Sequence, residues 1–236
     1  MVVAVSTVQG YGSPTDRLGI PISDPGIQAK FEMADLGLAF VTTNPTPGTA
    51  LAYNVQASYS ATVPFLYLAN TSAFLRVYLD YIKLIVTTPA ASGVQAYYAL
   101  IADAAARALT LDNTVALTPV CSNMALSPVS ALTVRAQNSG SASTLAASVA
   151  PRVVGRGALG GITIAGDELI IDFGAAGGHQ AHPGLTAAQA TTPGCKVSGS
   201  PALILGPGQS LAMSLWFPSN SATGLSYELE MSHQER

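Results

Sequence analysis

The chain has 236 residues, of which 49% are hydrophobic and only 10% are charged, and its formal net charge at pH 7 is −3. Soluble domains carry about 25% charged residues, so a surface of this composition gives up little hydration when it packs against a neighbour. The absence of a Lys/Arg cluster excludes a chain that binds nucleic-acid phosphates. No apolar run reaches the length of about 18 residues that a transmembrane helix needs, and Met1–Val5 lacks the basic region of a signal peptide.

Residues 1–30 are rich in glycine and proline, and we predict an extended N-terminal arm before a single β-sandwich domain over residues 31–236. Two alternatives remain open: a disordered terminus, or an arm that becomes ordered against a neighbouring subunit. Burying each large apolar side chain of the arm is worth about 1.5 kcal/mol or more. We therefore predict an intersubunit interface that contains apolar arm residues and the only tryptophan: Val2, Val3, Val5, Ile20, Ile22 and Trp216.

The first strand candidates follow directly after the arm. Leu36–Val41 is apolar and is stopped by a segment rich in proline and glycine. Thr62–Leu68 is the second candidate, and Pro64 within it indicates a sheet edge or the start of a strand.

Phe74–Val86 is the longest strand candidate. Its apolar residues change phase near Tyr81 or Ile82, which predicts a β-bulge or a bend where the strand crosses between sheets. Val94–Ile101 follows a turn and is predicted to be the hairpin partner of this strand. Ala102–Leu111 is rich in alanine, so one short helix is possible there.

The middle of the chain is weakly patterned. Ala131–Arg135 is a strand candidate, and Ala150–Gly157 leads into a predicted glycine-rich turn. Ile162–Ile164 and Leu169–Phe173 are predicted strands on either side of a tight turn. We interpret Gly174–Ser200 as a long surface loop.

The C-terminal segment carries the clearest pattern. Ala202–Leu205, Ser210–Phe217 and Leu225–Met231 are interrupted by turn sequences, and the last two alternate with a period of two. They are predicted to be consecutive antiparallel strands. Trp216 lies in the phase opposite to Leu215, so it belongs to a second core face or is an interface anchor, and the core is favoured. With roughly eight to ten strands and almost no helix, the sequence predicts an all-β antiparallel sandwich, jelly-roll-like in connectivity.

Few residues suggest chemistry, and we expect no catalytic residues, metal site or cofactor. His179 and His182 form the only close histidine pair, and Asp172 lies seven residues before it, but exposed loop histidines are the favoured interpretation. Asp167 and Glu168 are adjacent carboxylates that turn sequences commonly use, which is favoured over an acid/base pair.

Two further patterns carry little functional weight. Gly155–Gly160 matches the letters of a dinucleotide-binding loop, but no crossover helix follows, so a glycine-rich turn is favoured. Cys121 and Cys195 are the only cysteines, and two separate free thiols are favoured over a disulfide or a metal site.

Two stretches resemble β-rich structural proteins of tailed-bacteriophage virions, of the sort found beside the major capsid protein. The first comprises Arg152–Gly157, Ala165–Leu169 and Phe173–Gly174; the second comprises Leu205–Leu211, Leu215–Ser221 and Tyr227–Glu228. The resemblance covers roughly the last 85 residues and rests on turns and alternating strands. It implies a decoration (cement), head-fibre or tail-associated role, often with a jelly-roll fold, and no catalytic residues.

We therefore expect a non-enzymatic capsid decoration protein that bridges subunits of the major capsid protein, forms a trimer or dimer, and binds neither nucleic acid nor membrane. The expected location is the phage particle, after synthesis in the host cytoplasm. The alternative is a receptor- or glycan-binding fibre module, which a surface cluster among Tyr97, Tyr98, Trp216 and Tyr227 would favour. A hydrolase would need a pocket where His179 or His182 meets a carboxylate or a hydroxyl group.

Overall fold

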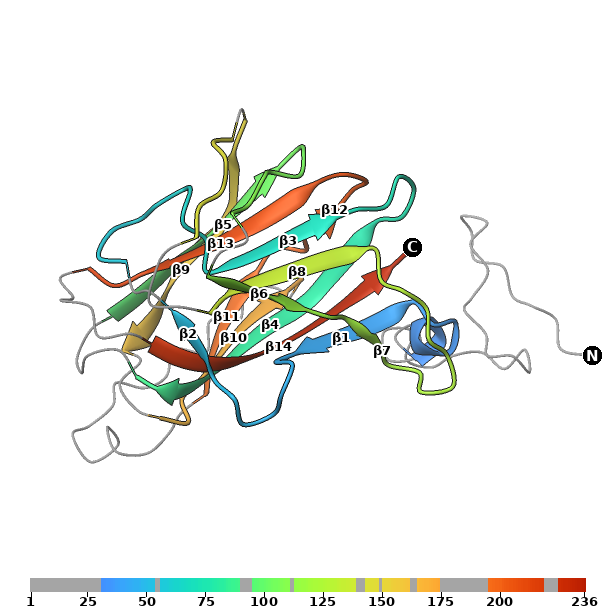
Figure 1. The fold of residues 1–236 in the computed structure, drawn as a ribbon, viewed down its shortest axis with the longest axis horizontal. Coiled ribbons are helices and arrows are strands. Elements are labelled where there is room, and N and C mark those ends of the chain that lie inside the picture. Colours follow the sequence, from blue (N-terminus) through green and yellow to red (C-terminus); the bar gives the residue numbers. More distant parts are fainter. Residues whose placement is uncertain are drawn as a thin grey trace, which may run out of the picture.

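The computed structural model describes residues 31–53, 56–89, 95–110, 113–138, 143–148, 150–161, 165–174, 195–218 and 225–236. Within these residues the chain forms fourteen strands in two sheets, which confirms the predicted antiparallel β-sandwich (Figure 1). The strands are β1 Ala39–Thr43, β2 Leu51–Tyr53, β3 Leu66–Asn70, β4 Val77–Thr88, β5 Gln95–Asp103, β6 Thr114–Leu117, β7 Val120–Cys121, β8 Leu132–Gln137, β9 Arg152–Gly161, β10 Glu168–Phe173, β11 Cys195–Ser200, β12 Ile204–Leu205, β13 Ser210–Trp216 and β14 Leu225–Glu235.

The two sheets differ in size. The larger has eight strands, with β11-β10-β4-β14-β1-β7 in sequence across it, β12 paired to β4 and β2 paired to β14. The smaller has six strands in the order β6-β8-β3-β13-β5-β9. Among these described strands only β10 and β11 pair in parallel.

Four strands from the first half of the chain pair antiparallel with four from the second half in reverse order. β1 pairs with β14, β3 with β13, β4 with β10 and β5 with β9. The first and third of these pairs lie in the larger sheet, and the other two lie in the smaller sheet. These four pairings are therefore nested, and they alternate between the two sheets.

The core lies between the inward faces of the two sheets, as the C-terminal alternation predicts. In β14, the odd-numbered residues are buried, while Glu228 and Glu230 face outward and are half-buried. In β13, Leu211, Met213 and Leu215 join the same apolar cluster. Both strands therefore contribute one face to a common core, although they lie in different sheets.

A β-bulge interrupts β4, which confirms the predicted change of phase. Tyr81 lies opposite Ser232 and Leu79 lies opposite His233, so Asp80 is the extra residue. Asp80 and Tyr81 are both half-buried on the outer side, whereas Leu79 and Ile82 are buried. The bulge therefore keeps apolar residues in the core on both sides of it.

The predicted pairing of neighbouring strands is wrong. Val94–Ile101 is not the hairpin partner of Phe74–Val86, because β5 lies in the other sheet between β13 and β9. The consecutive strands β13 and β14 are likewise in different sheets. Alternation shows that a strand has a buried face, and it does not reveal which of two facing sheets the strand joins.

The predicted glycine-rich turn is also wrong, because residues 152–161 form β9 at the end of the smaller sheet. A Cβ atom on Gly157 would lie 2.8 Å from Cε1 of Tyr98. The Tyr98 ring thus passes over a backbone without a side chain, and its hydroxyl group is 2.7 Å from Oγ of Ser198. Gly155 and Gly157 therefore serve close packing within a strand.

Helix and loop predictions need correction as well. The described part of Ala102–Leu111 contains no helix, since β5 continues to Asp103 and Arg107 then binds the Tyr67 hydroxyl group through its backbone. A helical turn occurs instead at residues 31–35, so β1 begins only at Ala39. The predicted loop at Gly174–Ser200 contains β11, and residues 175–194 lie outside the described residues.

Candidate interaction surfaces

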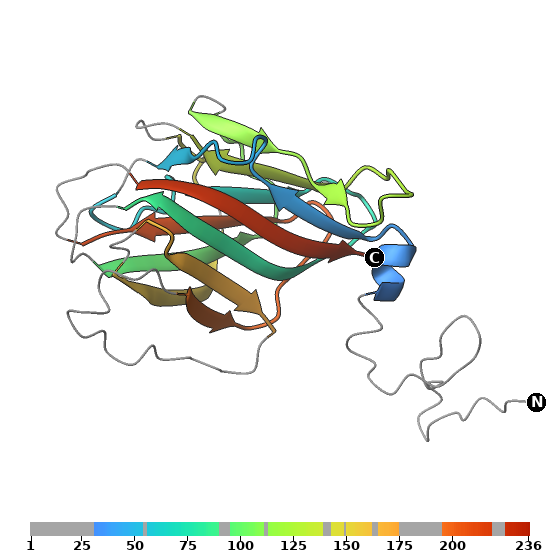
Figure 2. The same cartoon turned by 90° about the horizontal axis from the view of Figure 1, so that it is seen from below.

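Of the predicted interface residues, Trp216 alone can be placed in the structure. Val2, Val3, Val5, Ile20 and Ile22 lie outside the described residues, as do His179 and His182. The described chain begins with the helical turn at residues 31–35, which lies beside the C terminus at one end of the sandwich (Figure 2). Any contact of the arm therefore starts from this end.

Trp216 is not part of a second core face. Its ring is partly exposed on the outer side of β13, stacked on Tyr97 of β5 with ring centroids 5.9 Å apart. Tyr59 meets it edge-on at 5.5 Å and is 45% exposed. By contrast Tyr98 and Tyr227 are buried in the core. Tyr59, Tyr97 and Trp216 form a surface group that we term the aromatic cluster.

The opposite end of β13 has a different surface. Ten large hydrophobic side chains are exposed among the described residues, and seven of them come from the helical turn, the β3–β4 loop, β7 and the segment after β7. These elements all lie toward the end of the sandwich that carries the helical turn (Figures 1 and 2). In the view of Figure 1, the β3–β4 loop lies on the other side of the C terminus from the helical turn and β7. We term this group the apolar end: Phe31, Leu36, Phe74, Val120, Met124, Leu126 and Val129.

The sequence around the apolar end lacks charge. No charged residue occurs between residues 36 and 75 or between residues 113 and 134. Glu32 and Asp35 on the helical turn are exposed, and Arg76 is exposed at the start of β4. The most exposed side chains, Met124 and Val129, thus lie in a segment without ions that would have to lose water on contact.

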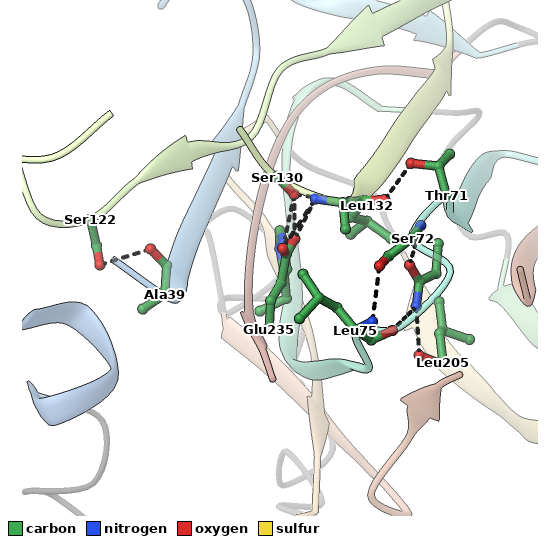
Figure 3. A network of polar contacts seen from close by, with 12 residues as sticks. Ala39, Thr71, Ser72, Leu75, Ser122, Ser130, Leu132, Leu205 and Glu235 are labelled. Carbon is green, nitrogen blue, oxygen red and sulfur yellow. Dashed lines mark hydrogen bonds and ion pairs between the residues drawn. The ribbon is translucent and has the colours of Figure 1, made fainter. Parts of the chain in front are cut away.

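Hydrogen bonds fix the loop that carries Phe74. The amide group of Asn70 donates to the carbonyl groups of Leu75, Leu205 and Gly206 at 2.8 to 3.0 Å. Its oxygen accepts from the backbone N–H of Ser72, and Oγ of Ser72 accepts from the N–H groups of Phe74 and Leu75 (Figure 3). Asn70 is fully buried, so this loop is held by a satisfied polar centre.

A second polar centre fixes the segment that carries Val129. The Glu235 carboxylate accepts from Oγ of Ser130 at 2.5 Å and from the N–H of Ala131 at 2.9 and 3.0 Å (Figure 3). Nε2 of His233 lies 3.2 Å from the same carboxylate. Burial of Glu235 opposes its ionisation, but the hydrogen bonds from His233, Ser130 and Ala131 outweigh burial and lower the pKa of the carboxyl group.

The two polar centres are joined directly. Both the N–H and the hydroxyl group of Thr71 donate to the carbonyl of Ala131, at 2.8 and 2.9 Å. Arg76 and Arg236 exchange a pair of backbone hydrogen bonds. The β3–β4 loop, the segment before β8 and the C terminus therefore form one connected frame beneath Phe74 and Val129.

Ser130, His233 and Glu235 are residue types of a catalytic triad, but their geometry is not that of one. In a triad the hydroxyl and the carboxylate contact opposite nitrogens of the histidine. Here both lie 3.2 Å from Nε2, and Nδ1 has no hydrogen-bond partner among the described residues. His233 is fully buried and stacks on Phe40. The group is a structural clasp for the C terminus.

A hollow of about 260 Å³ lies on the outer face of the larger sheet, beside the bulge. Its lining includes Asp80, Tyr81, Lys83 and Glu230. The Tyr81 hydroxyl donates to Glu230 at 2.6 Å; burial, that hydrogen bond and nearby carboxylates raise the pKa of Tyr81. Asp80 accepts from Ser232 at 3.0 Å. Tyr81 and Glu230 therefore satisfy each other, whereas the partners of Asp80 and Lys83, Ser232 and Glu168, lie outside the lining.

The other residues that the sequence analysis considered as candidates for chemistry, where the structure describes them, do not form a site. Asp167 directly precedes β10 and Glu168 is the first residue of that strand, where its Oε1 lies 3.4 Å from Nζ of Lys83. Cys121 and Cys195 are free thiols, buried and exposed respectively, as predicted. The described residues contain no group of three or more His, Cys, Asp or Glu that could hold a metal ion. Nor does any helix in this part of the chain have the length and hydrophobicity to cross a membrane.

No protein-family model, curated protein or solved structure matches this chain.

The sequence analysis missed the apolar end and its frame. One available signal was an isolated apolar residue between turn formers, as with Val129 between Pro128 and Ser130. Another was the phase of β14, because His233 and Glu235 continue the apolar positions of Leu225–Met231. Polar residues in a buried phase indicate a buried polar centre, since such groups require hydrogen-bond partners.

Proposed function

We propose that this chain is a non-enzymatic structural protein of a phage particle, an outer decoration protein that bridges subunits of the major capsid protein. The observation that carries the proposal is the apolar end on its hydrogen-bonded frame. A surface that is already ordered loses little conformational entropy when a partner covers it. Because Met124 and Val129 lie in a segment without charged residues, little hydration is lost there, and repetition on a lattice strengthens even weak contacts.

We further propose that the sandwich is a jelly roll. In support, the pairing of β1, β3, β4 and β5 with β14, β13, β10 and β9 is nested and alternates between the two sheets. Jelly rolls occur in viral capsid and lectin domains, so the topology is compatible with the proposed role and does not by itself establish it.

The test is the composition of purified phage particles from the source of this sequence. We expect peptides of this chain at a fixed ratio to the major capsid protein, and the purified chain should cosediment with particles from which it has been stripped. The variant with Phe74→Ser, Met124→Ser and Val129→Ser should cosediment less. Particles that lack the chain would overturn the proposal.

A receptor- or glycan-binding module is the second candidate, and the aromatic cluster is the observation that favours it. Aromatic rings exposed on a sheet can pack against the apolar faces of sugar rings. Since Trp216 is the only tryptophan, its fluorescence reports on this cluster alone. Titration with neutral oligosaccharides should change that fluorescence in the native chain and not in Tyr97→Ala. No change with any oligosaccharide would remove this candidate.

A further inference from the structure

The apolar end is displayed more strongly than any other apolar surface in the described part of the chain. Met124 is 100% exposed, Val129 94% and Phe74 89%, whereas the exposed large apolar residues outside the apolar end are exposed to 59%, 47% and 45% (Val153, Ile204 and Tyr59). Isolated exposed apolar residues are ordinary, but a group rimmed by polar residues marks an interaction site. The frame below it holds two of the three carrying segments in a fixed arrangement, so the surface is prepared for an occupant.

The N-terminal segment starts from this surface. Phe31 and Leu36 are part of the apolar end, so the chain leaves it directly into residues 1–30. That segment holds valines and isoleucines and only four charged residues, Asp16, Arg17, Asp24 and Lys30. Thirty residues span at most roughly 100 Å when extended, which is ample to reach the corresponding end of an adjacent copy.

We infer that, in the absence of capsids, the apolar end binds the N-terminal segment, residues 1–30, of a second copy of this chain. On a particle, the capsid protein takes the place of that segment. Each copy then donates one segment and receives one, so a closed dimer or ring covers every apolar end. Exchange of identical segments needs no separate pocket, since the surface and its occupant come from the same sequence.

The first experiment measures self-association of the full chain by sedimentation velocity over a range of concentrations, without capsids. Phe74→Ser, Met124→Ser and Val129→Ser together should weaken association at least about tenfold, equivalent to 1.4 kcal/mol. The matched control, Tyr59→Ser, Val153→Ser and Ile204→Ser, removes exposed apolar residues elsewhere and should change it less than about twofold. Circular dichroism checks that both variants remain folded.

Deletion of residues 1–28 supplies the other half of a double-mutant cycle. If the segment binds the apolar end, the deletion should weaken association as much as the triple substitution, and the combination should weaken it no further. Effects that multiply would mean that the two regions act independently and would overturn the inference. A full chain that stays monomeric at its highest soluble concentration would overturn it as well.

A crosslinking experiment identifies which copy supplies the segment. Two chains are prepared with Cys121→Ala and Cys195→Ala, one carrying Val5→Cys and the other Val129→Cys. After mixing and mild oxidation, we expect a disulfide-linked heterodimer. Because the triple substitution itself changes Val129, its effect is tested with the cysteine at Leu126→Cys instead. The Leu126→Cys chain should crosslink to the Val5→Cys chain, and the triple substitution in the Leu126→Cys chain should suppress that crosslink. If a single chain with both Val5→Cys and Val129→Cys closes internally while the mixture gives no heterodimer, the segment covers its own domain and the inference is wrong.

This inference and the proposed function fail separately. Self-association through exchanged segments requires no capsid, so particles that lack the chain would leave it intact. A chain that is monomeric in solution and still decorates capsids would support the proposed function and overturn the exchange.

Discussion

The apolar end and the aromatic cluster lie at opposite ends of β13 and are built differently. At the apolar end, Phe74 and Val129 project from loops whose backbones are fixed by Asn70 and Glu235. In the aromatic cluster, Trp216 and Tyr97 come from paired strands and contact each other. The first surface is held by polar groups beneath it, and its three most exposed side chains, Phe74, Met124 and Val129, are 89% to 100% exposed in the described part of the chain. The second is rigid through its own apolar contacts.

This difference separates the residues that stabilise the fold from those available to a partner. At the apolar end the two tasks fall on different residues: the frame carries stability and the exposed side chains carry contact. In the aromatic cluster the same rings do both. At the apolar end, a substitution should therefore affect either the stability of the fold or the binding of a partner. In the aromatic cluster, a substitution should affect both.

The largest effect is expected for Glu235→Ala, which removes the acceptor of the clasp. Ser130 and the N–H of Ala131 then lose a charged partner in a buried place, and we expect a loss of about 3 kcal/mol in the free energy of unfolding. Urea denaturation measures it. Glu228→Ala on the outer face of the same strand is the control and should cost less than about 0.5 kcal/mol. Equal losses of unfolding free energy in the two variants would show that the hydrogen bonds of Glu235 do not stabilise the frame.

The same clasp gives a pH dependence. Because the pKa of Glu235 is lowered from 4.5 in the folded chain, its stabilisation is fully present above that value and disappears as the pH falls through the folded pKa. The native chain should exceed Glu235→Gln in unfolding free energy by a constant amount near neutral pH, and by less below pH 4.5. Unfolding curves at a series of pH values measure this difference. A gap that widens in acid would contradict the assignment.

A smaller effect is expected for Tyr97→Ala in the aromatic cluster. The loss of one stacked ring should lower the free energy of unfolding by about 1 kcal/mol and shift the emission of Trp216 to longer wavelength, because water replaces the ring. Denaturation followed by tryptophan fluorescence measures both. Glu235→Ala should leave the emission of the folded state unchanged, since the two regions are at opposite ends of β13. A shift in that variant would mean that the ends are coupled.

The smallest effect on stability is expected for Val129→Ser. Its side chain is 94% exposed, so the free energy of unfolding should change by less than about 0.5 kcal/mol. Self-association should nevertheless weaken, because the lost contact belongs to the complex. Thermal denaturation and sedimentation velocity of the same sample compare the two. A stability loss comparable to that of Tyr97→Ala would show that Val129 packs within its own chain.

Local pattern alone determined the existence and faces of many strands. The alternation of Leu225–Met231 and of Leu211–Phe217 predicted which side chains enter the core, and the phase change near Tyr81 predicted the bulge at Asp80. These features follow from the period of two along a strand, which every residue in the pattern reports. From the low charge and the scattered titratable groups we also expected that the chain has no catalytic residues, and this stays a prediction.

The tertiary structure decided how the strands associate and which surfaces result. The alternation of apolar and polar residues along a strand does not predict which sheet the strand joins, because two facing sheets bury the same kind of face. Nor does it predict that β11 pairs in parallel. Tyr98 packing over Gly157 made a strand of a glycine-rich segment, and contacts of Arg107 with Tyr67 overrode the helix propensity of its alanines. Trp216 and Val129 look alike in sequence, as apolar residues beside turns. Only the fold places one against Tyr97 and leaves the other exposed, since exposure depends on neighbours that are distant in the chain.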